Sequence, residues 1–394
     1  MKKTKRQRDV PAIRFPGFTD SWEQRKLGEL CNITTGKLDA NAMVSDGQYD
    51  FYTSGIDVFK IGVAAFEGPA ITIAGNGASV GYMHLADGKF NAYQRTYVLT
   101  DFLADRQFLN VAIGNELPDK IQEEVRGSGI PYIVLNMLTD LAIPFPSHEE
   151  QYAIGVYFQQ LDNLITLQER KCRVLRELKK CMLQKMFPKN GSDIPEIRFP
   201  GFTDSWEQRK LLDYADFYSG NGLSWNDISD DGQEECILYG NLYTEYGMIA
   251  DKIVYRTNST IKNPVYSKFG DVLIPASDTT PTGLARATSI EKSGVLLGGD
   301  INIVRPKDKI NGSCLSLAIN ANKKELIKFI KGTSVRHIHN ADIKTIEIPM
   351  PQNNAEQEKL VNYFKNLDNL ITLQERKCKV LRELKKCMLQ KMFV

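Results

Sequence analysis

Several features common in secreted and membrane proteins are missing from this sequence of 394 residues. It has seven cysteines but no Cys-x-x-Cys pair, and we interpret all seven as reduced thiols, mostly in packing positions. No run approaches the roughly 18 apolar residues that are needed to span a membrane. The basic start, Met1–Arg8, is not followed by the apolar stretch that a signal peptide requires. We therefore expect a cytoplasmic protein that does not contact a membrane.

Motifs of catalysis are equally scarce. There is no G-x-x-x-x-G-K-[ST] loop for ATP, and the pair His337 and His339 has no neighbouring Cys or carboxylate cluster to complete a metal site. Residues 263–266 read Asn-Pro-Val-Tyr, which resembles the Asn-Pro-Pro-Tyr motif of amino-methyltransferases. However, Val265 replaces the second proline, and no Gly-rich cofactor loop precedes the motif at a suitable distance. We expect no catalytic residue, no metal site and no cofactor in this chain.

The overall charge is small, but its distribution is uneven. The chain carries 50 Lys and Arg against 48 Asp and Glu, a net charge of +2, which by itself does not indicate nucleic acid. Residues 170–189 contain eight basic residues and one acid, Glu177, and residues 376–391 repeat the pattern. Such a run suits either a solvated helix face or a surface that meets nucleic acid.

A long internal repeat is the strongest signal in the sequence. Residues 13–27 read IRFPGFTDSWEQRKL, and residues 197–211 read the same fifteen letters. Residues 161–187 match residues 367–393 throughout, except that Lys379 replaces Arg173. The sequences between the matching blocks are dissimilar, and the second copy is 22 residues longer there. A period near 200 residues indicates duplicated domains, with a shared scaffold that carries two different modules.

Each copy ends in a segment with the pattern of a long amphipathic helix. Between residues 149 and 186 there is no proline, and apolar residues recur at intervals of three and four, as in a coiled coil. Pro188 follows the first helix, and basic residues crowd its last turns, as expected at a helix C-terminus. We predict an antiparallel pair with a pseudo-two-fold axis. The residues predicted to pack between the helices are Leu161, Ile165, Leu175, Met182, Leu367, Ile371, Leu381 and Met388. The alternative is an ordinary homodimerising coiled coil.

Both dissimilar regions have the pattern of mixed α/β domains. In each, a short strand leads into a polar loop with glycine, at residues 70–82 and 271–284. Further strands are predicted at residues 96–100 and 302–305. Each region then has a helix followed by glycine, predicted at residues 107–126 and 315–331, and a short strand ending in Pro-x-Pro. A Glu-Gln pair follows, at residues 150–151 and 356–357, and the long helix begins.

In this order of parts, the chain resembles the specificity subunits of type I restriction-modification systems. Residues 71–75 and 270–274 resemble the recognition-domain strands of that family. The resemblance implies an α+β protein with two α/β target recognition domains, separated by two long helices. We divide the chain into a basic tail (1–12), recognition domain 1 (13–147), repeat helix 1 (148–187), a linker (188–196), recognition domain 2 (197–351) and repeat helix 2 (352–394).

The resemblance also implies a function. Each recognition domain reads one half of a split site in double-stranded DNA, and the helices space the halves. Two methyltransferase subunits bind the scaffold and methylate adenine with S-adenosylmethionine, and a motor-nuclease subunit joins for restriction. ATP and Mg are expected on those partners. The rival hypotheses are a stand-alone DNA methyltransferase, which needs cofactor motifs that we do not find, and a structural coiled-coil dimer.

Candidate DNA-reading residues follow from the chemistry of base recognition. Arg pairs with guanine and Asn or Gln with adenine, whereas Lys, Ser and Thr commonly hold phosphates. The candidates lie in the polar loops, where an ordinary surface loop is the alternative for each. In the first domain they are Asn76, Ser79, Lys89, Asn91, Gln94 and Arg95, and in the second Ser277, Thr280, Arg286, Arg336, His337 and His339. In the repeated block, we expect Phe15, Phe18 and Trp22 to anchor the chain on a helix end.

Overall fold

The computed structural model describes residues 10–124, 131–189 and 191–393. It divides into two compact units, of which unit 1 comprises Met1–Arg170 with Glu375–Val394, and unit 2 comprises Lys171–Gln374. We call residues 13–147 head 1 and residues 197–351 head 2. The predicted basic tail lies, up to residue 9, outside the described residues. Among the residues that are described, no helix is both long and apolar enough to cross a membrane.

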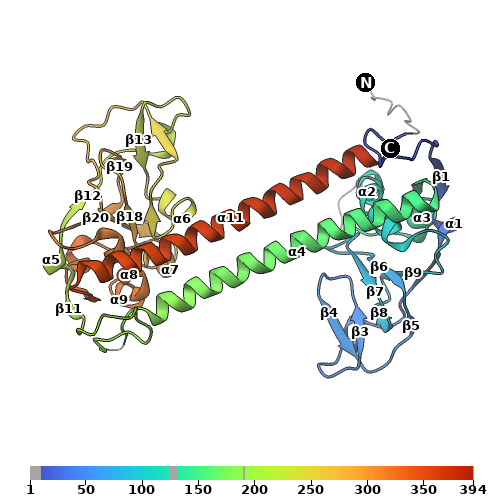
Figure 1. Cartoon of the computed structure of the whole chain (residues 1–394), viewed down its shortest axis with the longest axis horizontal. Coiled ribbons are helices and arrows are strands. Elements are labelled where there is room, and N and C mark those ends of the chain that lie inside the picture. Colours follow the sequence, from blue (N-terminus) through green and yellow to red (C-terminus); the bar gives the residue numbers. More distant parts are fainter. Residues whose placement is uncertain (1–9, 125–130, 190, 394) are drawn as a thin grey trace. The chain divides into compact units, whose positions relative to one another are not determined.

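Head 1 contains two four-stranded sheets with the orders β2-β9-β6-β7 and β4-β3-β8-β5, and a two-stranded ribbon β1-β10 (Figure 1). The central strand β6 is wholly buried, as its sequence Ala-Ile-Thr-Ile-Ala predicts. The elements of unit 1 are β1 (Glu23–Lys26), α1 (Leu27–Leu30), β2 (Asn32–Thr35), η1 (Ala40–Ala42), β3 (Tyr49–Tyr52), β4 (Val58–Ile61), β5 (Phe66–Glu67), β6 (Ala70–Ala74), β7 (Met83–Ala86), β8 (Lys89–Ala92), β9 (Thr96–Thr100), α2 (Arg106–Glu124), α3 (Leu135–Thr139), β10 (Ala142–Phe145) and the first part of α4 (His148–Lys185).

Head 2 is built around a five-stranded sheet with the order β12-β20-β16-β18-β14, beside a smaller sheet β15-β13-β19 and the ribbons β11-β22 and β17-β21. Its elements are β11 (Glu207–Lys210), α5 (Leu211–Tyr214), β12 (Ala215–Ser219), η2 (Trp225–Asp227), β13 (Glu234–Ile237), α6 (Asn241–Thr244), β14 (Ile249–Ala250), β15 (Tyr255–Thr257), β16 (Val272–Pro275), β17 (Ser277–Asp278), α7 (Pro281–Leu284), β18 (Thr288–Ile290), β19 (Leu296–Leu297), β20 (Ile301–Pro306), α8 (Gly312–Ala321), α9 (Lys323–Ile327), β21 (Arg336–His337), α10 (Asn340–Ile343) and β22 (Glu347–Met350), followed by α11 (Asn354–Met392).

Most predicted elements are present, with one difference in head 2. The strands predicted at residues 96–100 and 302–305 are β9 and β20, and the helix predicted at 107–126 is α2, as far as residue 124. The single helix predicted at residues 315–331 is wrong, because it is divided into α8 and α9. Asn322 ends α8, since its backbone N–H and its side-chain amide both donate to carbonyls of the last turn.

The two long helices pair in antiparallel fashion within each unit, which confirms the predicted arrangement. In unit 1, Lys385 of α11 bonds to Asp162 of α4, and Arg382 bonds to Glu169, so the residue numbers run in opposite directions. Among the predicted packing residues, Leu161, Ile165, Leu367 and Ile371 are buried; Leu175, Met182, Leu381 and Met388 are half-buried.

Each head core is completed by the far end of a long helix. In unit 1, Met392 and Phe393 at the end of α11 belong to the buried cluster of head 1, together with Trp22. In unit 2, Met186 and Phe187 after α4 join the core of head 2 with Trp206. A helix that begins beside one head therefore supplies apolar side chains to the core of the other.

The predicted Glu-Gln pair at the start of each long helix holds three segments together. In unit 1, the buried carboxylate of Glu150 accepts hydrogen bonds from Arg14 Nε (2.6 Å) and Nη2 (2.7 Å) and from Trp22 Nε1 (3.1 Å). Gln151 accepts the Asp105 N–H at 3.0 Å and donates to the Pro146 carbonyl at 2.8 Å. We call the Arg–Glu–Trp set the clasp, and it fastens the repeated block to the helix.

Unit 2 repeats the clasp with Glu356, which accepts from Arg198 Nε (2.7 Å) and Nη2 (2.8 Å) and from Trp206 Nε1 (3.3 Å). The hydrogen bond to Glu356, reinforced by its charge, raises the pKa of Arg198 above its ordinary value, and Glu150 does the same to Arg14. The matching sequence blocks therefore form equivalent contacts in the two units.

Candidate nucleic-acid interface

Head 1 brings together three segments that are distant in the sequence. The Gly75 N–H donates to the Arg95 carbonyl at 2.9 Å, and the Gly75 carbonyl accepts the Ile133 N–H at 2.7 Å. Asn76 and Tyr132 pair in an isolated antiparallel bridge. The loop after β6, the turn before β9 and the segment after α2 thus meet at one place, which we call the reading edge of head 1.

Polar and aromatic side chains populate this edge. The Asn76 side-chain oxygen accepts a hydrogen bond from Ser54 Oγ at 2.7 Å, which fixes the orientation of the amide. The ring of Tyr82 lies 4.9 Å from that of His84, and His84 lies 5.1 Å from Tyr52. Burial lowers the pKa of His84, so this ring stays neutral to a lower pH than an exposed histidine does. Gln94 and Arg95 are exposed beside the edge.

Head 2 has an equivalent edge. Its loop after β16 forms β17, which pairs with β21 so that Ser277 is opposite His337 and Asp278 is opposite Arg336. The Ala276 carbonyl accepts the Ile338 N–H at 3.1 Å, as the Gly75 carbonyl accepts Ile133 in head 1. The segment that contains Ser277 and the segment that contains Arg336 and His337, distant in the sequence, therefore form one surface.

Several candidate side chains project from the head 2 edge. His337 and His339 are exposed, and their rings are nearly parallel, with centroids 6.1 Å apart. Thr280 is exposed and donates to Asp278 at 3.2 Å. Arg336 donates from Nη1 to the Gly332 carbonyl at 3.1 Å, while its buried Nε has no partner among the described residues. These groups retain donors that can face a nucleic acid.

Arg286 has a partly structural position. It donates from Nη1 to the Leu242 carbonyl at 2.5 Å, and its guanidinium carbon lies 5.5 Å from the centroid of the Tyr243 ring. The Tyr243 hydroxyl in turn donates to the Ser277 carbonyl at 2.8 Å. The Arg286 side chain is half-buried at this site, and it braces α6 against the loop after β16.

Two candidates are wrong because their side chains are buried and engaged. Asn91 is 3% exposed; its amide donates to the Val63 carbonyl at 2.9 Å and its oxygen accepts the Ala92 N–H at 2.9 Å. Ser277 is 8% exposed, and its hydroxyl donates to Asp300 at 3.1 Å. Neither has a free group for a base edge.

Two other candidates in head 1, Lys89 and Ser79, are less favourably placed for contact with DNA. Lys89 is exposed, but it lies opposite Glu67 in the β5-β8 ladder, apart from the loop after β6. Ser79 is half-buried, and its carbonyl accepts the Tyr82 N–H at 2.9 Å in a tight turn. They are therefore weaker candidates than Asn76, Gln94 and Arg95.

Sequence reasoning missed Tyr132 and Tyr239. Tyr132 is 59% exposed on the head 1 edge, and Tyr239 is 41% exposed beside Tyr243, with ring centroids 6.5 Å apart. Both are single aromatic residues in irregular segments, where no periodicity marks them as surface residues. The one available signal for Tyr132 is its position just after the glycine that follows the helix.

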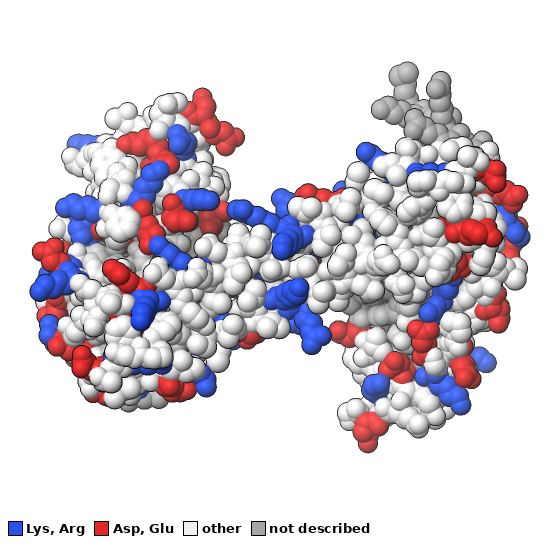
Figure 2. Space-filling model, viewed as in Figure 1, with Lys and Arg blue, Asp and Glu red and all other residues white. Residues whose placement is uncertain are grey.

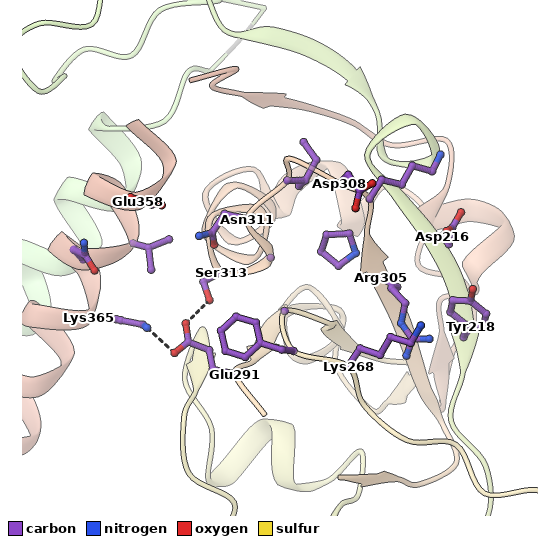
Figure 3. A pocket seen from close by; sticks show the side chains of 18 residues that line it. Asp216, Tyr218, Lys268, Glu291, Arg305, Asp308, Asn311, Ser313, Glu358 and Lys365 are labelled. Carbon is purple, nitrogen blue, oxygen red and sulfur yellow. Dashed lines mark hydrogen bonds and ion pairs between the residues drawn. The ribbon is translucent and has the colours of Figure 1, made fainter. Parts of the chain in front are cut away.

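A large cavity, of about 880 Å³, lies elsewhere in unit 2, between head 2 and α11. Figure 3 shows Glu291 at its wall between Ser313 and Lys365, to which it is bonded at 2.9 Å and 2.5 Å. Val361 of α11 lines this cavity. The repeat places Gly155 at the matching position of α4, where a Cβ would lie 2.7 Å from Asp105 Oδ1, so head 1 packs closer to its helix.

Nothing in the described chain assembles a metal centre: no group of three or more His, Cys, Asp or Glu side chains there has a suitable arrangement. The Asn-Pro-Val-Tyr segment lies in a loop, with the Asn263 carbonyl accepting a hydrogen bond from Asn221 at 3.1 Å.

Comparison with known families identifies the architecture. Residues 19–177 and 203–383 each match the type I restriction modification DNA specificity domain. The chain belongs to this family. The match occurs twice and covers both heads with most of both helices, in agreement with the internal repeat.

Individual relatives of this specificity-domain family agree. The chain is 39% identical over 184 residues to the type I restriction enzyme EcoDI specificity subunit of Escherichia coli, which covers 45% of this chain and 40% of the relative. It is 25% identical over 286 residues to the MjaVIII specificity subunit of Methanocaldococcus jannaschii, covering 68% and 64%. The matched segments thus span about two fifths to two thirds of the lengths of these relatives.

Solved structures show the same fold at low identity. The crystal structure of a type I restriction-modification S subunit from M. genitalium superposes with a TM-score of 0.67 at 16% identity, over 98% of this chain and 99% of that chain. A chain from a structural study of type I R-M complex assembly superposes at 0.54 and 18% identity, over 97% and 99%. The specificity-subunit fold therefore extends over the whole chain.

Proposed function

We propose that this chain is the DNA sequence-specificity subunit of a type I restriction-modification complex. Head 1 and head 2 each read one half of a bipartite site in double-stranded DNA, and α4 and α11 set the gap. Partner subunits methylate adenine with S-adenosylmethionine and cleave with ATP and Mg, while this chain supplies no catalytic group. The observation that supports this most is that the same clasp occurs in both units, while the side chains at the two reading edges differ.

The two edges explain how two different half-sites are read. Both place the loop after a central strand beside the segment after the last long helix of the head. The framework is shared, but the side chains differ: the exposed Tyr132 of head 1 corresponds to the exposed His337 of head 2, and Asn76 of head 1 corresponds to the buried Ser277. Since side chains at base edges carry sequence information, the heads are expected to recognise different bases.

Replacing residues 28–147 by the matching region of another specificity subunit tests this proposal. We expect the methylated motif to change in one half only, because head 2 and both helices are untouched. The measurement is a genome-wide map of methylated adenines in cells that express the chain with its methyltransferase. A motif that changes in both halves, or S-adenosylmethionine binding by the isolated chain, would contradict the proposal.

The helix pair has an exposed apolar surface in each unit that is suited to a methyltransferase partner. Each unit has four exposed leucine and valine side chains beside the packed row of its helices, and we call each set of four an apolar face. The residues are Leu164, Leu167, Val380 and Leu384 in unit 1, and Val174, Leu178, Leu370 and Leu373 in unit 2. They are 39% to 61% exposed. At about 100° per residue, those of unit 1 lie on the opposite side of the helix pair from the ion pair Glu169–Arg382.

Basic residues border both apolar faces. Figure 2 shows Lys and Arg side chains gathered over the middle of the long helices. By helical spacing, Lys171 lies one turn after Leu167, and Lys377 lies one turn after Leu373. An amphipathic partner helix with an apolar stripe and acidic flanks is complementary to such a surface. Because an apolar face occurs in each unit, we propose one methyltransferase subunit on each.

A charge on each apolar face is expected to prevent this association. In the double variant Leu164→Asp and Leu370→Asp, we expect the dissociation constant for the methyltransferase to rise at least ~10-fold, since two exposed apolar contacts are replaced by desolvated charges. The matched control is Thr166→Asp with Thr372→Asp, on the other side of the same helices. Sedimentation or light scattering of the mixture measures the complex; equal loss in both variants would argue against these faces.

A further inference from the structure

The helix pair contains the same Lys–Asp contact twice. In unit 1, Lys385 Nζ lies 2.5 Å from Asp162 Oδ1. In unit 2, Lys179 bonds to Asp368 in the same way. The internal repeat relates Lys179 to Lys385 and Asp162 to Asp368, so the two contacts are equivalent.

These lysines occupy positions that apolar residues fill elsewhere along the helices. Lys179 lies one helical turn beyond Leu175 and three residues before Met182, in the row of residues that packs between the helices. Its side chain is 17% exposed, and that of Lys385 is 31% exposed. A charged group in such a row costs stability and is best known for specifying the orientation and register of paired helices.

The helix ends Met186–Phe187 and Met392–Phe393 pack in the head cores and favour the antiparallel orientation. Along the helices between them, however, apolar packing does not by itself distinguish the antiparallel from the parallel orientation. Because residues 161–187 and 367–393 are nearly identical, parallel helices in register would also place leucine opposite leucine and isoleucine opposite isoleucine. That arrangement would set Lys179 against Lys385 and Glu169 against Glu375. The antiparallel pairing instead gives each lysine an aspartate, so charge distinguishes two arrangements that apolar contacts along the helices do not.

The register is selected in the same way. Apolar residues recur with a seven-residue period, so a slip of seven residues preserves much of the apolar packing. A slip in one direction would bring Glu169 level with Glu375 and Lys385 level with Gly155. A slip in the other would bring Asp162 level with Met392 and Arg382 level with Arg176. Of these three registers, only the observed one places Asp162 and Glu169 both opposite cations.

We infer that Lys179 and Lys385, through Asp368 and Asp162, specify the antiparallel orientation and register of the helix pair, and so determine the gap between the half-sites. The second part rests on the proposed function. A slip of seven residues moves one helix by about 10 Å along the other. That displacement corresponds to about three base pairs at 3.4 Å each. These lysines are positioning residues and do not contact DNA.

Charge reversal with rescue tests the inference. The variant K179E/K385E places acids opposite Asp368 and Asp162, and the fourfold variant K179E/K385E/D162K/D368K restores both pairs with reversed sign. The matched control is K180E/K386E, one position further along each helix and outside the packing row. All are made in the full chain, which carries E169C and R382C for cross-linking.

The first readout needs neither DNA nor a partner. A short bis-maleimide joins the two introduced thiols to each other only in the observed register, and peptide mass spectrometry identifies the product. We expect the yield of the cross-linked product to fall at least ~10-fold in K179E/K385E, because two attractive ion pairs are replaced by two pairs of carboxylates that repel each other. It should return to within about twofold of the parent in the fourfold variant. An unchanged yield in K179E/K385E, or a loss equal to that in the control, would overturn the inference.

The second readout is the gap in the methylated motif, with the native Glu169 and Arg382 and the methyltransferase present. We expect K179E/K385E to lose methylation at the parent motif or to shift its gap, and the fourfold variant to restore the original gap. An unchanged gap despite a lost cross-link would overturn the assignment of the gap to these lysines. If the parent chain directs no bipartite methylation, the proposed function fails while the cross-linking result stands.

Discussion

Replacing Phe393 by alanine should destabilise head 1, although Phe393 follows the helix that starts beside head 2. Phe393 is 6% exposed and lies 6.0 Å from the rings of both Trp22 and Phe108 and 6.3 Å from that of Phe158. Loss of a buried phenylalanine with incomplete collapse of the cavity costs about 3–5 kcal/mol. That is a large part of the stability of an ordinary domain, about 5–15 kcal/mol.

The repeat supplies a matched variant for this experiment. Phe187 is the equivalent residue in unit 2, where it is 1% exposed and packs 5.5 Å from Trp206 and 6.3 Å from Phe364. Hydrogen exchange with mass spectrometry should show faster exchange in residues 28–124 for Phe393→Ala and in residues 212–350 for Phe187→Ala. Val380→Ala, at a position that is 61% exposed, should change neither. If Phe393→Ala made hydrogen exchange faster in head 2 instead, the assignment of Phe393 to the core of head 1 would be refuted.

Replacing Glu150 by glutamine should release the repeated block from the start of α4. The Glu150 side chain is 1% exposed, and that of Arg14 is 11% exposed. Removing the negative charge leaves the guanidinium without its anion and weakens both hydrogen bonds that it donates. Breaking a buried ion pair on one side costs about 3–5 kcal/mol. We expect a lower thermal midpoint and faster proteolysis at residues 13–22.

A control variant and a compensating variant show whether the loss of stability comes from the missing charge or from the changed side-chain shape. Glu149→Gln alters the exposed neighbour in the same turn and should change the free energy of unfolding by less than about 0.5 kcal/mol. The double variant Arg14→Met with Glu150→Met removes both charges together, and it should recover much of the loss, since apolar replacement of a buried pair is often neutral. Glu356→Gln should weaken the matching clasp in unit 2. A stability equal to that of the unaltered chain in Glu150→Gln would show that the clasp contributes little.

The candidate DNA-reading residues show how much of the site could be predicted from side-chain chemistry and local sequence pattern. Strand–loop patterns correctly placed Asn76 and Arg95 at the end of a buried strand and at the start of the next one. Asn91 has the same favourable chemistry, but it lies in β8, where residues 90–92 are all buried, and its amide donates to the Val63 carbonyl. Polarity alone does not distinguish an exposed asparagine from one that satisfies a buried carbonyl.

Local sequence determined the parts of this protein, and the tertiary structure determined how they meet. Helix periodicity, proline and glycine signals, and the duplicated blocks are properties of short segments, so the matching helices could be predicted from the sequence alone, at residues 148–187 and 352–394. The partners of Glu150 and Phe393 could not, because Arg14 and Trp22 lie far from both in the chain. Contacts between such distant residues depend on how the whole fold closes. The repeat provides two similar packing sites for a helix end, beside Trp22 and Phe158 in one unit and beside Trp206 and Phe364 in the other. Only the folded chain decides that the end of α11 occupies the core of head 1.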